Sequence, residues 1–239
     1  MHVTPPPKIL GVLGGMGPAA SAEFMRLLTL KSPAGKDQEH PIVYLLSDSQ
    51  MPDRGAAIRG EGEDITPRLK ADLEKLVSWG ADILATPCST AHVFIDRFYD
   101  GLSVPYLHIV KETIASCRAK SPQGAWLLAT TATCATGLYE NHAKAMGYSF
   151  RKADAAIQQE VQRCVEEVKA ARMDDAGKRM SAIVKRLWKE ADILVATACT
   201  ELPLAFDASG LPADRNVSSI EALSDASLEA LYPGIYQRG

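Results

Sequence analysis

The sequence of 239 residues lacks several features that would assign it to a specialised class. It has no apolar run approaching the ~20 residues that span a bilayer, and residues 1–8 lack the charged head and apolar core of a signal peptide. The net charge of −3 gives no reason to expect binding to nucleic acid or to an anionic membrane. We therefore expect a soluble, cytoplasmic protein.

Cysteine is sparse, and its distribution argues against a disulfide framework. There are five cysteines, an odd number, and no two of them form a CxxC pair. A structural zinc site is therefore not expected, and reduced thiols are the default state. Cys164 lies on the apolar stripe of a predicted helix and is assigned to the core, whereas Cys117 and Cys134 share no recognisable context.

The remaining composition is that of an ordinary globular protein. Hydrophobic residues make up 46% of the chain and charged residues 23%, and the length suits one large domain or two of average size. Predicted strands and helices alternate, which favours an α/β fold with parallel sheets. A turn cluster at 121–124 is the best candidate boundary between two halves. Strands are predicted at 104–110, 125–130, 147–150 and near 217, and helices at 111–119, 137–146, 155–173, 175–189 and 219–231.

One stretch of the sequence occurs twice in similar form. Residues 81–92 are Ala-Asp-Ile-Leu-Ala-Thr-Pro-Cys-Ser-Thr-Ala-His, and residues 191–201 are Ala-Asp-Ile-Leu-Val-Ala-Thr-Ala-Cys-Thr-Glu. Each copy is a short apolar run followed by threonine, cysteine and further hydroxyl residues. Such runs are typical of buried parallel strands, and ligands bind outside the carboxyl ends of these strands. The repeat predicts that Cys88 and Cys199 occupy equivalent positions in the two halves.

These two cysteines have a structural and a catalytic interpretation. A free cysteine is often only a small buried hydrophobic residue. Two cysteines at equivalent points of a repeat favour function, because thiols on opposite sides of one cleft could remove a proton from one face of a carbon and return it to the other. The N-terminus of a helix lowers the pKa of a thiol, and we expect this effect at both Cys88 and Cys199.

A glycine-rich turn follows the first predicted strand. The strand spans 8–14, the turn is Gly14-Gly-Met-Gly-Pro18, and a helix is predicted over 19–30. Proline suits the first turn of a helix, and the amides at a helix start can bind an anion. The spacing excludes a dinucleotide-binding fingerprint and a P-loop. Two interpretations remain, a carboxylate-binding turn or glycines that only tighten the connection.

An arginine follows the second predicted strand, at 41–47. The loop 48–54 ends in Arg54, whose planar guanidinium is suited to a substrate carboxylate, although an arginine in a loop is more often simply solvated. The polar, glycine-rich segment 55–64 is predicted to be a mobile flap over the site. A further helix starts at Thr66.

Four motifs together resemble the aspartate racemase branch of the aspartate/glutamate racemase superfamily. They are Gly11-Val-Leu-Gly-Gly-Met-Gly-Pro18, Met51-Pro-Asp-Arg54, Pro87-Cys-Ser-Thr-Ala-His92 and Ala198-Cys-Thr-Glu-Leu202. The resemblance covers nearly the whole chain. It implies two similar three-layer αβα domains with parallel sheets, related by pseudo-two-fold symmetry, with the active site in the cleft between them. It assigns 1–119 with 214–239 to the first domain and 120–213 to the second, and it implies a homodimer.

The resemblance also implies the chemistry. Members of this branch racemise acidic amino acids without pyridoxal phosphate or metal, by proton transfer between two cysteines, here Cys88 and Cys199. The carboxylate clamp would consist of Arg54 and Lys169. The remaining expected substrate contacts are Met16, Gly17, Gln50, Ser89, Thr90, Thr131, Thr133, Thr200 and Glu201.

Three positions leave alternatives open. His92 could orient the site near Cys88 or serve only as a structural cap. Glu201 could bind the substrate ammonium or raise the basicity of its partner. Ser89 stands where the family usually has asparagine, and a serine is shorter and has a single hydroxyl, so a preference for another acidic substrate over aspartate is open.

We therefore predict an isomerase that interconverts L- and D-aspartate, or a closely related acidic amino acid, by two-base proton transfer at the α-carbon. Two other functions remain possible on the same residues. One is an isomerase or decarboxylase of a dicarboxylic acid with the same fold, similar to a maleate isomerase. The other is a non-catalytic dicarboxylate-binding protein.

Overall fold

The chain forms two compact units, and the computed structural model describes residues 3–238. The first unit comprises 1–109 and 220–239, and the second comprises 110–219. The sequence analysis places these boundaries at 119 and 214 instead. The first boundary differs because helix α5 (Ile109–Lys120) lies almost wholly in the second unit, where Arg118 donates a hydrogen bond of 3.0 Å to the Met146 carbonyl.

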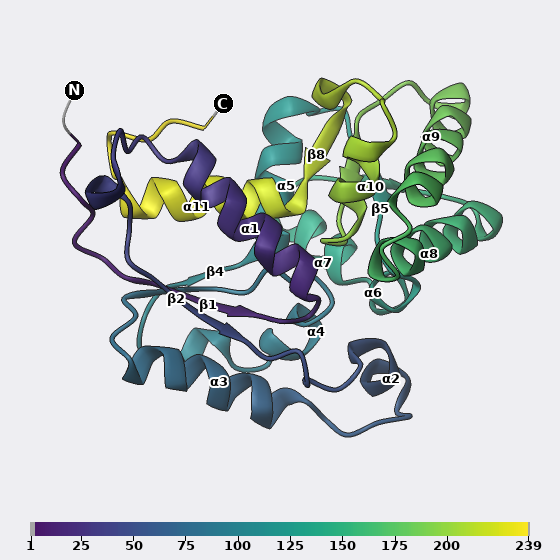
Figure 1. Cartoon of the computed structure of the whole chain (residues 1–239). Coiled ribbons are helices and arrows are strands. Elements are labelled where there is room, and N and C mark those ends of the chain that lie inside the picture. The colour runs from purple at the N-terminus through teal and green to yellow at the C-terminus, as the bar shows by residue number, and fades with distance from the viewer. Residues whose placement is uncertain (1–2, 239) are drawn as a thin grey trace. The chain divides into compact units, whose positions relative to one another are not determined.

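The first unit is built on a parallel sheet of four strands in the order β2-β1-β3-β4 (Figure 1). The strands are β1 (Leu10–Gly14), β2 (Val43–Ser47), β3 (Ile83–Ala85) and β4 (Tyr106–Leu107). β1 is buried along its whole length, as expected for an apolar strand covered on both faces. Leu10 pairs with Val43 on one side and with Ile83 on the other. The carboxyl ends of the strands therefore lie at one edge of the sheet.

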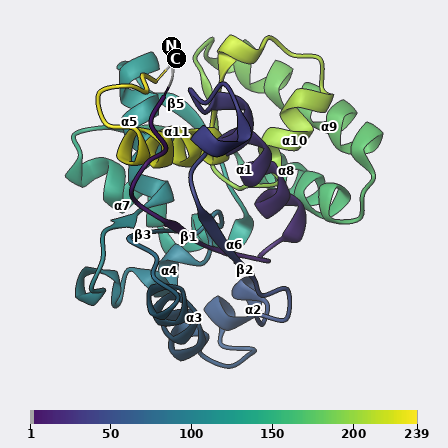
Figure 2. The ribbon, with the colours of Figure 1, turned by 60° about the vertical axis from the view of Figure 1, so that its left-hand side comes forward.

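Helices cover both faces of this sheet (Figures 1 and 2). The helices of this unit are α1 (Pro18–Lys31), α2 (Arg54–Arg59), α3 (Thr66–Ser78), α4 (His92–Ile95) and α11 (Ser219–Leu231). Figure 1 shows α1 and α11 on one face and α3 on the other. α3 buries Leu69, Leu73 and Leu76, because this spacing places all three on one side of a helix. Lys31 of α1 lies 2.9 Å from Glu221 of α11, which ties the C-terminal helix to the first unit.

The second unit repeats this topology with a parallel sheet in the order β6-β5-β7-β8. Its strands are β5 (Ala125–Leu128), β6 (Phe150–Lys152), β7 (Val195–Thr197) and β8 (Asn216–Ser218), and its further helices are α6 (Thr131–Thr136), α7 (Leu138–Ala145), α8 (Ala155–Lys169), α9 (Met173–Glu190) and α10 (Leu202–Ala208). Residues of α8, α9 and α10 share one hydrophobic core with Trp126 and Val195 of the sheet. No helix in the described part of the chain has the length and hydropathy needed to cross a membrane.

The two sheets correspond strand by strand, which confirms the predicted fold class of two similar α/β units with parallel sheets. β1 and β5 are both inner strands, and β3 and β7 are their inner neighbours. β3 ends at Ala85 and β7 ends at Thr197, and Cys88 and Cys199 follow these ends within the next few residues. The predicted repeat is therefore a repeat of position in the fold as well as of sequence.

Three local details differ from the sequence prediction. The helix expected over 137–146 is preceded by a separate α6, because Gly137 adopts φ +67° between α6 and α7, a left-handed conformation that glycine tolerates. The segment 55–64 is not wholly irregular, since it includes most of α2, whose N-cap Asp53 accepts a hydrogen bond from the Ala56 N–H. The helix expected after Cys88 starts only at His92, whereas the helix expected over 201–206 starts at Leu202, within one residue of the prediction.

Candidate active site

The turn between β1 and α1 is closed by its own hydrogen bonds. Gly15 has φ +91°, and a Cβ atom there would lie 2.3 Å from the backbone of Asp48. The Gly15 N–H donates to Ser21 Oγ at 2.9 Å, and the Ser21 hydroxyl donates to the Gly17 carbonyl at 3.2 Å. This amide is used within the protein, which favours the interpretation that the glycines tighten the connection. Met16, the next predicted site residue, is 3% exposed.

Arg54 connects the loops that follow β1 and β2. Its Nη1 donates to the carbonyls of Met51 and Pro52 at 3.3 and 3.2 Å, and its Nη2 donates to the Met16 carbonyl at 3.3 Å. These hydrogen bonds are long and their acceptors are neutral, whereas a carboxylate is a stronger partner for a guanidinium. The structure thus brings the predicted site residues Met16 and Arg54 together and leaves Arg54 able to bind an anion.

The loop that carries Gln50 is fixed by Asp48. The Gln50 N–H donates to Asp48 Oδ1 at 3.0 Å, while the Gln50 side chain is exposed. Arg68 of α3 forms an ion pair of 2.7 Å with the same carboxylate. Sequence reasoning missed this ion pair, because its members lie on different elements and no local spacing links them.

Cys88 lies in an irregular segment between β3 and α4. It is 5% exposed, its N–H donates to the Thr86 carbonyl at 2.8 Å, and its own carbonyl is 2.8 Å from Nδ1 of His92. Ser89 is 2% exposed, and Thr90 is partly buried. Since α4 begins only at His92 and has 4 residues, Cys88 does not occupy the helix N-terminus that the sequence predicts.

Cys199 is paired with a carboxylate. Its thiol donates to Glu201 Oε2 at 3.0 Å, and the Thr200 hydroxyl donates to the same oxygen at 3.4 Å. Burial first, and then the charge of Glu201, raise the pKa of Cys199 well above its usual value, and Lys169 opposes this rise. The prediction that a helix start lowers the pKa of Cys199 is wrong, because the thiol is buried beside a carboxylate and α10 begins only at Leu202.

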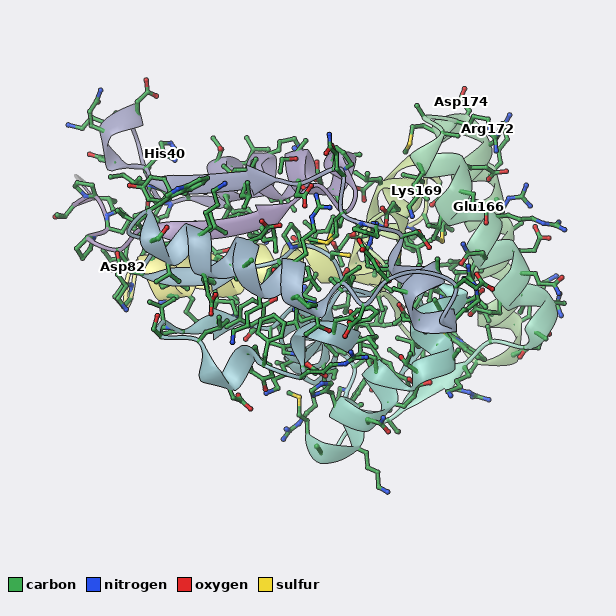
Figure 3. All side chains as sticks on the ribbon, turned by 90° about the horizontal axis from the view of Figure 1, so that it is seen from below. His40, Asp82, Glu166, Lys169, Arg172 and Asp174 are labelled. Carbon is green, nitrogen blue, oxygen red and sulfur yellow. The ribbon has the colours of Figure 1, made fainter. Side chains whose placement is uncertain are left out.

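Lys169 is the last residue of α8, and its side chain is exposed (Figure 3). Its positive charge favours the thiolate of Cys199, so the two residues lie within electrostatic range of each other. The structure therefore brings together four predicted site residues of the second unit, namely Lys169, Cys199, Thr200 and Glu201.

The threonine-rich segment after β5, which forms the start of α6, is held by a helix cap and by two glutamines. Thr130 Oγ1 accepts a hydrogen bond from the Thr133 N–H at 3.1 Å, so Thr133, which is 1% exposed, belongs to the cap of α6. The Thr131 N–H donates to Gln162 Oε1 at 3.1 Å, and Gln158 Nε2 donates to Thr131 Oγ1 at 3.4 Å. Sequence reasoning missed both glutamines. Their spacing puts them on one face of α8, but only the fold shows what that face contacts.

The predicted site residues thus fall into two sets. Those that share the first unit with Cys88 are Met16, Gly17, Gln50, Arg54, Ser89 and Thr90, and those that share the second unit with Cys199 are Thr131, Thr133, Lys169, Thr200 and Glu201. Each unit therefore supplies one cysteine beyond the end of a strand and one predicted substrate-binding cation.

Comparison with known proteins identifies the family. The sequence model of the Asp/Glu/Hydantoin racemase family matches residues 13–222. The chain belongs to this family. It is similar to the broad specificity amino-acid racemase RacX of Bacillus subtilis (strain 168), with 27% identity over 206 residues that cover 83% of this chain and 88% of that protein.

Solved structures agree with this assignment. The aspartate racemase of Picrophilus torridus is similar with a TM-score of 0.81 and 27% identity, over 94% of both chains. The glutamate racemase of Thermus thermophilus, solved in complex with β-chloro-D-alanine, has a TM-score of 0.67 and 17% identity, over 99% of this chain and 85% of that one, and supports the fold alone. These comparisons confirm the resemblance to the aspartate racemase branch and support an amino-acid racemase as the class of enzyme.

Proposed function

We propose that this protein is a cofactor-independent racemase of aspartate, or of a closely related acidic amino acid, with Cys88 and Cys199 as the two acid–base groups. The observation that carries the proposal is the equivalence of the two cysteines, each of which follows the same strand of its own four-stranded sheet. Thiols supplied from equivalent positions can serve the two opposite faces of one α-carbon.

The chemistry requires a proton to leave one face and another to arrive at the opposite face. A thiolate removes the α-proton, and the electron pair of the broken C–H bond passes into the carboxylate, which becomes an enediolate. The second thiol then donates its proton to the opposite face of the same carbon. Acid–base catalysis of this kind contributes about 10²–10⁴-fold, so much of the remaining barrier must be lowered by positive charge and amides that stabilise the enediolate.

Glu201 allows Cys199 to change between its thiol and thiolate forms. The raised pKa makes Cys199 a thiol in the resting protein, ready to donate a proton. To act as a base on the other enantiomer, Cys199 must first lose that proton, and Glu201 Oε2 lies 3.0 Å from its sulfur as the acceptor. The transfer moves a proton within the pair and leaves its total charge unchanged, which avoids the cost of burying a second charge.

Arg54 and Lys169 are the proposed partners of the substrate carboxylates. The guanidinium of Arg54 can exchange its long contacts with backbone carbonyls for a shorter, bidentate pair with a carboxylate. Lys169 supplies a point charge that also favours the Cys199 thiolate. An acidic amino acid carries two carboxylates, and two cations of this kind would hold both.

A broader substrate range is a second candidate. The similar protein RacX is named a broad specificity racemase, and Ser89 is a short residue, 2% exposed, directly beside Cys88. A shorter side chain at this position leaves room for substrates with other side chains. The substrate panel in the experiment below therefore includes neutral and basic amino acids.

The test is uptake of solvent deuterium at the α-carbon, followed by NMR in D₂O with both enantiomers of each amino acid. We expect exchange and racemisation of at least one acidic amino acid, and loss of racemisation in Cys88→Ser and Cys199→Ser. Cys134→Ser is the matched control, because this partly buried thiol contacts Gln158 at 3.5 Å and serine keeps the donor. Absence of exchange across the panel, with conversion of a dicarboxylic acid instead, would replace the racemase with the isomerase or decarboxylase alternative.

A further inference from the structure

A buried histidine and a partly buried tyrosine form a hydrogen-bonded relay next to Cys88. His92 is 0% exposed and its Nδ1 lies 2.8 Å from the Cys88 carbonyl oxygen. The hydroxyl of Tyr106, on β4, lies 2.9 Å from Nε2 of the same ring. All three residues belong to the first unit, so this arrangement depends on that unit alone.

The groups at the two ends of the relay determine which atom donates each of its hydrogen bonds. A backbone carbonyl can only accept, so Nδ1 of His92 carries the hydrogen and donates it to Cys88. A neutral imidazole has a single N–H, which makes Nε2 the acceptor of the Tyr106 hydroxyl. Burial raises the pKa of Tyr106 far above its usual value, so the phenol keeps the proton that it donates.

We infer that His92 and Tyr106 are positioning residues for Cys88, which they hold through its backbone carbonyl so that its thiol keeps one direction. The inference rests on the proposed two-cysteine racemase. Cys88 needs such support, because it lies in irregular backbone between a strand of 3 residues and a helix of 4. A displacement of about 1 Å can lower the rate of a proton transfer about 10²-fold.

The surroundings of the relay favour this positioning role over direct acid–base catalysis. Both ring nitrogens of His92 are engaged, one by the backbone and one by Tyr106, so neither faces a substrate. The rings are also packed, since the His108 centroid lies 4.4 Å from that of His92 and the Tyr99 centroid lies 5.8 Å from that of Tyr106. Cys199 is held differently, by a side-chain hydrogen bond to Glu201. Loss of the relay should therefore affect one of the two thiols.

Two substitutions of His92 separate the two ends of the relay. Asparagine can place an amide N–H near the position of Nδ1 and keep the bond to Cys88, whereas glutamine reaches the position of Nε2 and leaves the Cys88 carbonyl without its donor. We expect His92→Asn, which loses only the contact to Tyr106, to lower kcat by no more than about tenfold and His92→Gln to lower it about 10²-fold, with KM changed less than kcat in both. Equal losses in the two variants would overturn the inference.

Tyr106→Phe tests the far end of the relay. It removes the hydroxyl that orients His92 and that also interacts with Thr86, and we expect kcat to fall about threefold to tenfold. Tyr148→Phe is the matched control, because it also removes a tyrosine hydroxyl that is hydrogen-bonded, here at 3.0 Å to the Ser121 carbonyl in the second unit. Thermal unfolding of all variants shows what each costs in stability. A loss of kcat in Tyr148→Phe equal to that in Tyr106→Phe would assign the effect to general destabilisation.

A readout that does not need racemase activity is the alkylation rate of each cysteine by iodoacetamide, followed by peptide mass spectrometry. In His92→Gln the backbone around Cys88 loses its anchor, and we expect Cys88 to react about tenfold faster while Cys199 is unchanged. An unchanged rate at Cys88 would overturn the positioning role whatever the activity of the enzyme. Absence of α-proton exchange in the unmodified protein would instead overturn the proposed function and leave the alkylation result to decide the inference.

The kinetic isotope effect measured with α-deuterated substrate shows which of the two proton transfers is slowed, the one at Cys88 or the one at Cys199. When only the transfers at Cys88 are slow, the isotope effect rises for the enantiomer whose α-hydrogen Cys88 removes, because that removal then limits the rate. It falls for the other enantiomer, because delivery of a proton by Cys88 then limits the rate. General damage lowers the active fraction and changes neither value. An unchanged pair of isotope effects in His92→Gln, despite a lower kcat, would contradict the relay.

Discussion

The thiol of Cys199 donates a hydrogen bond to the carboxylate of Glu201, with 3.0 Å between Sγ and Oε2. Both side chains are almost fully buried, at 5% and 4% exposed. A buried carboxylate beside a thiol disfavours the thiolate and at the same time offers the proton a place to go. Cys88 has its backbone held by a histidine instead, so the two cysteines differ in environment although they are equivalent in the fold.

Replacing Glu201 with glutamine should lower the pKa of Cys199 and also lower kcat. The pKa should fall because the negative charge that disfavours the thiolate is removed, although burial still raises it. The turnover should fall about 10–10²-fold because glutamine cannot take the thiol proton. The pH dependence of Cys199 alkylation measures the first effect, and initial rates by circular dichroism measure the second. Glu190→Gln, at an exposed position of α9, is the control, and an alkylation profile unchanged by Glu201→Gln would contradict this assignment.

The stability of the fold should fall as the pH rises above about 8.5. Burial raises the pKa of Cys117 and of Cys164 to about 12 and that of Cys134 to about 11, whereas thiols of an unfolded chain titrate near 8.5. Between these values the unfolded chain releases protons that the folded chain retains. The free energy of unfolding should therefore fall with a limiting slope of about 1.4 kcal/mol per pH unit for each such thiol. Urea unfolding at pH 7.5 and 9.5, with reductant present, measures this loss.

Cys164→Ala tests how much one of these thiols contributes to the pH dependence of stability. Cys164 is 0% exposed in the core of the second unit, so the substitution costs some stability at every pH. Its specific effect is a weaker pH dependence of the free energy of unfolding, because the variant lacks one of the buried thiols that retain a proton in the folded state. A pH dependence identical to that of the unmodified protein would show that burial of Cys164 is not a source of the effect.

Arg54→Ala should raise KM for an acidic amino acid by about 10–10²-fold, which corresponds to the loss of a charge-assisted hydrogen-bonded pair. The effect on kcat should be smaller if the contact is made in both the ground state and the transition state. Arg59→Ala is the matched control on the same helix, because Arg59 is exposed and pairs with Glu61 at 2.7 Å. An unchanged KM in Arg54→Ala would mean that the carboxylate binds elsewhere.

Much of the fold could be predicted because its signals are local. The repeated apolar runs before Cys88 and Cys199 form β3 and β7, and the helix predicted to start at Thr66 is α3, which buries Leu69, Leu73 and Leu76. The glycine-rich turn also lies where the sequence places it. Its role was open in the sequence and is clarified by the hydrogen bond from Gly15 to Ser21, whose side chain reaches back from the first turn of the following helix.

The parts of the site that sequence reasoning missed depend on tertiary contacts or on small shifts of helix boundaries. Tyr106 contacts His92 only because β4 pairs with β3, and Gln162 contacts Thr131 only because α8 packs beside the loop after β5. The expected effect of a helix start on Cys199 failed because the thiol is buried and lies beside the Glu201 carboxylate, which together raise its pKa.

Ser89→Asn should narrow the substrate range toward aspartate. Ser89 is 2% exposed and directly follows Cys88, and we expect a longer side chain there to reduce the space next to this cysteine. Asparagine also adds an amide donor and a carbonyl acceptor, which can pair with a short polar substrate and obstruct a longer one. The ratio of kcat/KM for aspartate to kcat/KM for larger amino acids should rise about tenfold, a change equivalent to about 1.4 kcal/mol. Thr136→Ser, in α6 of the second unit, is a conservative control, and an unchanged ratio in Ser89→Asn would show that this position does not select the substrate.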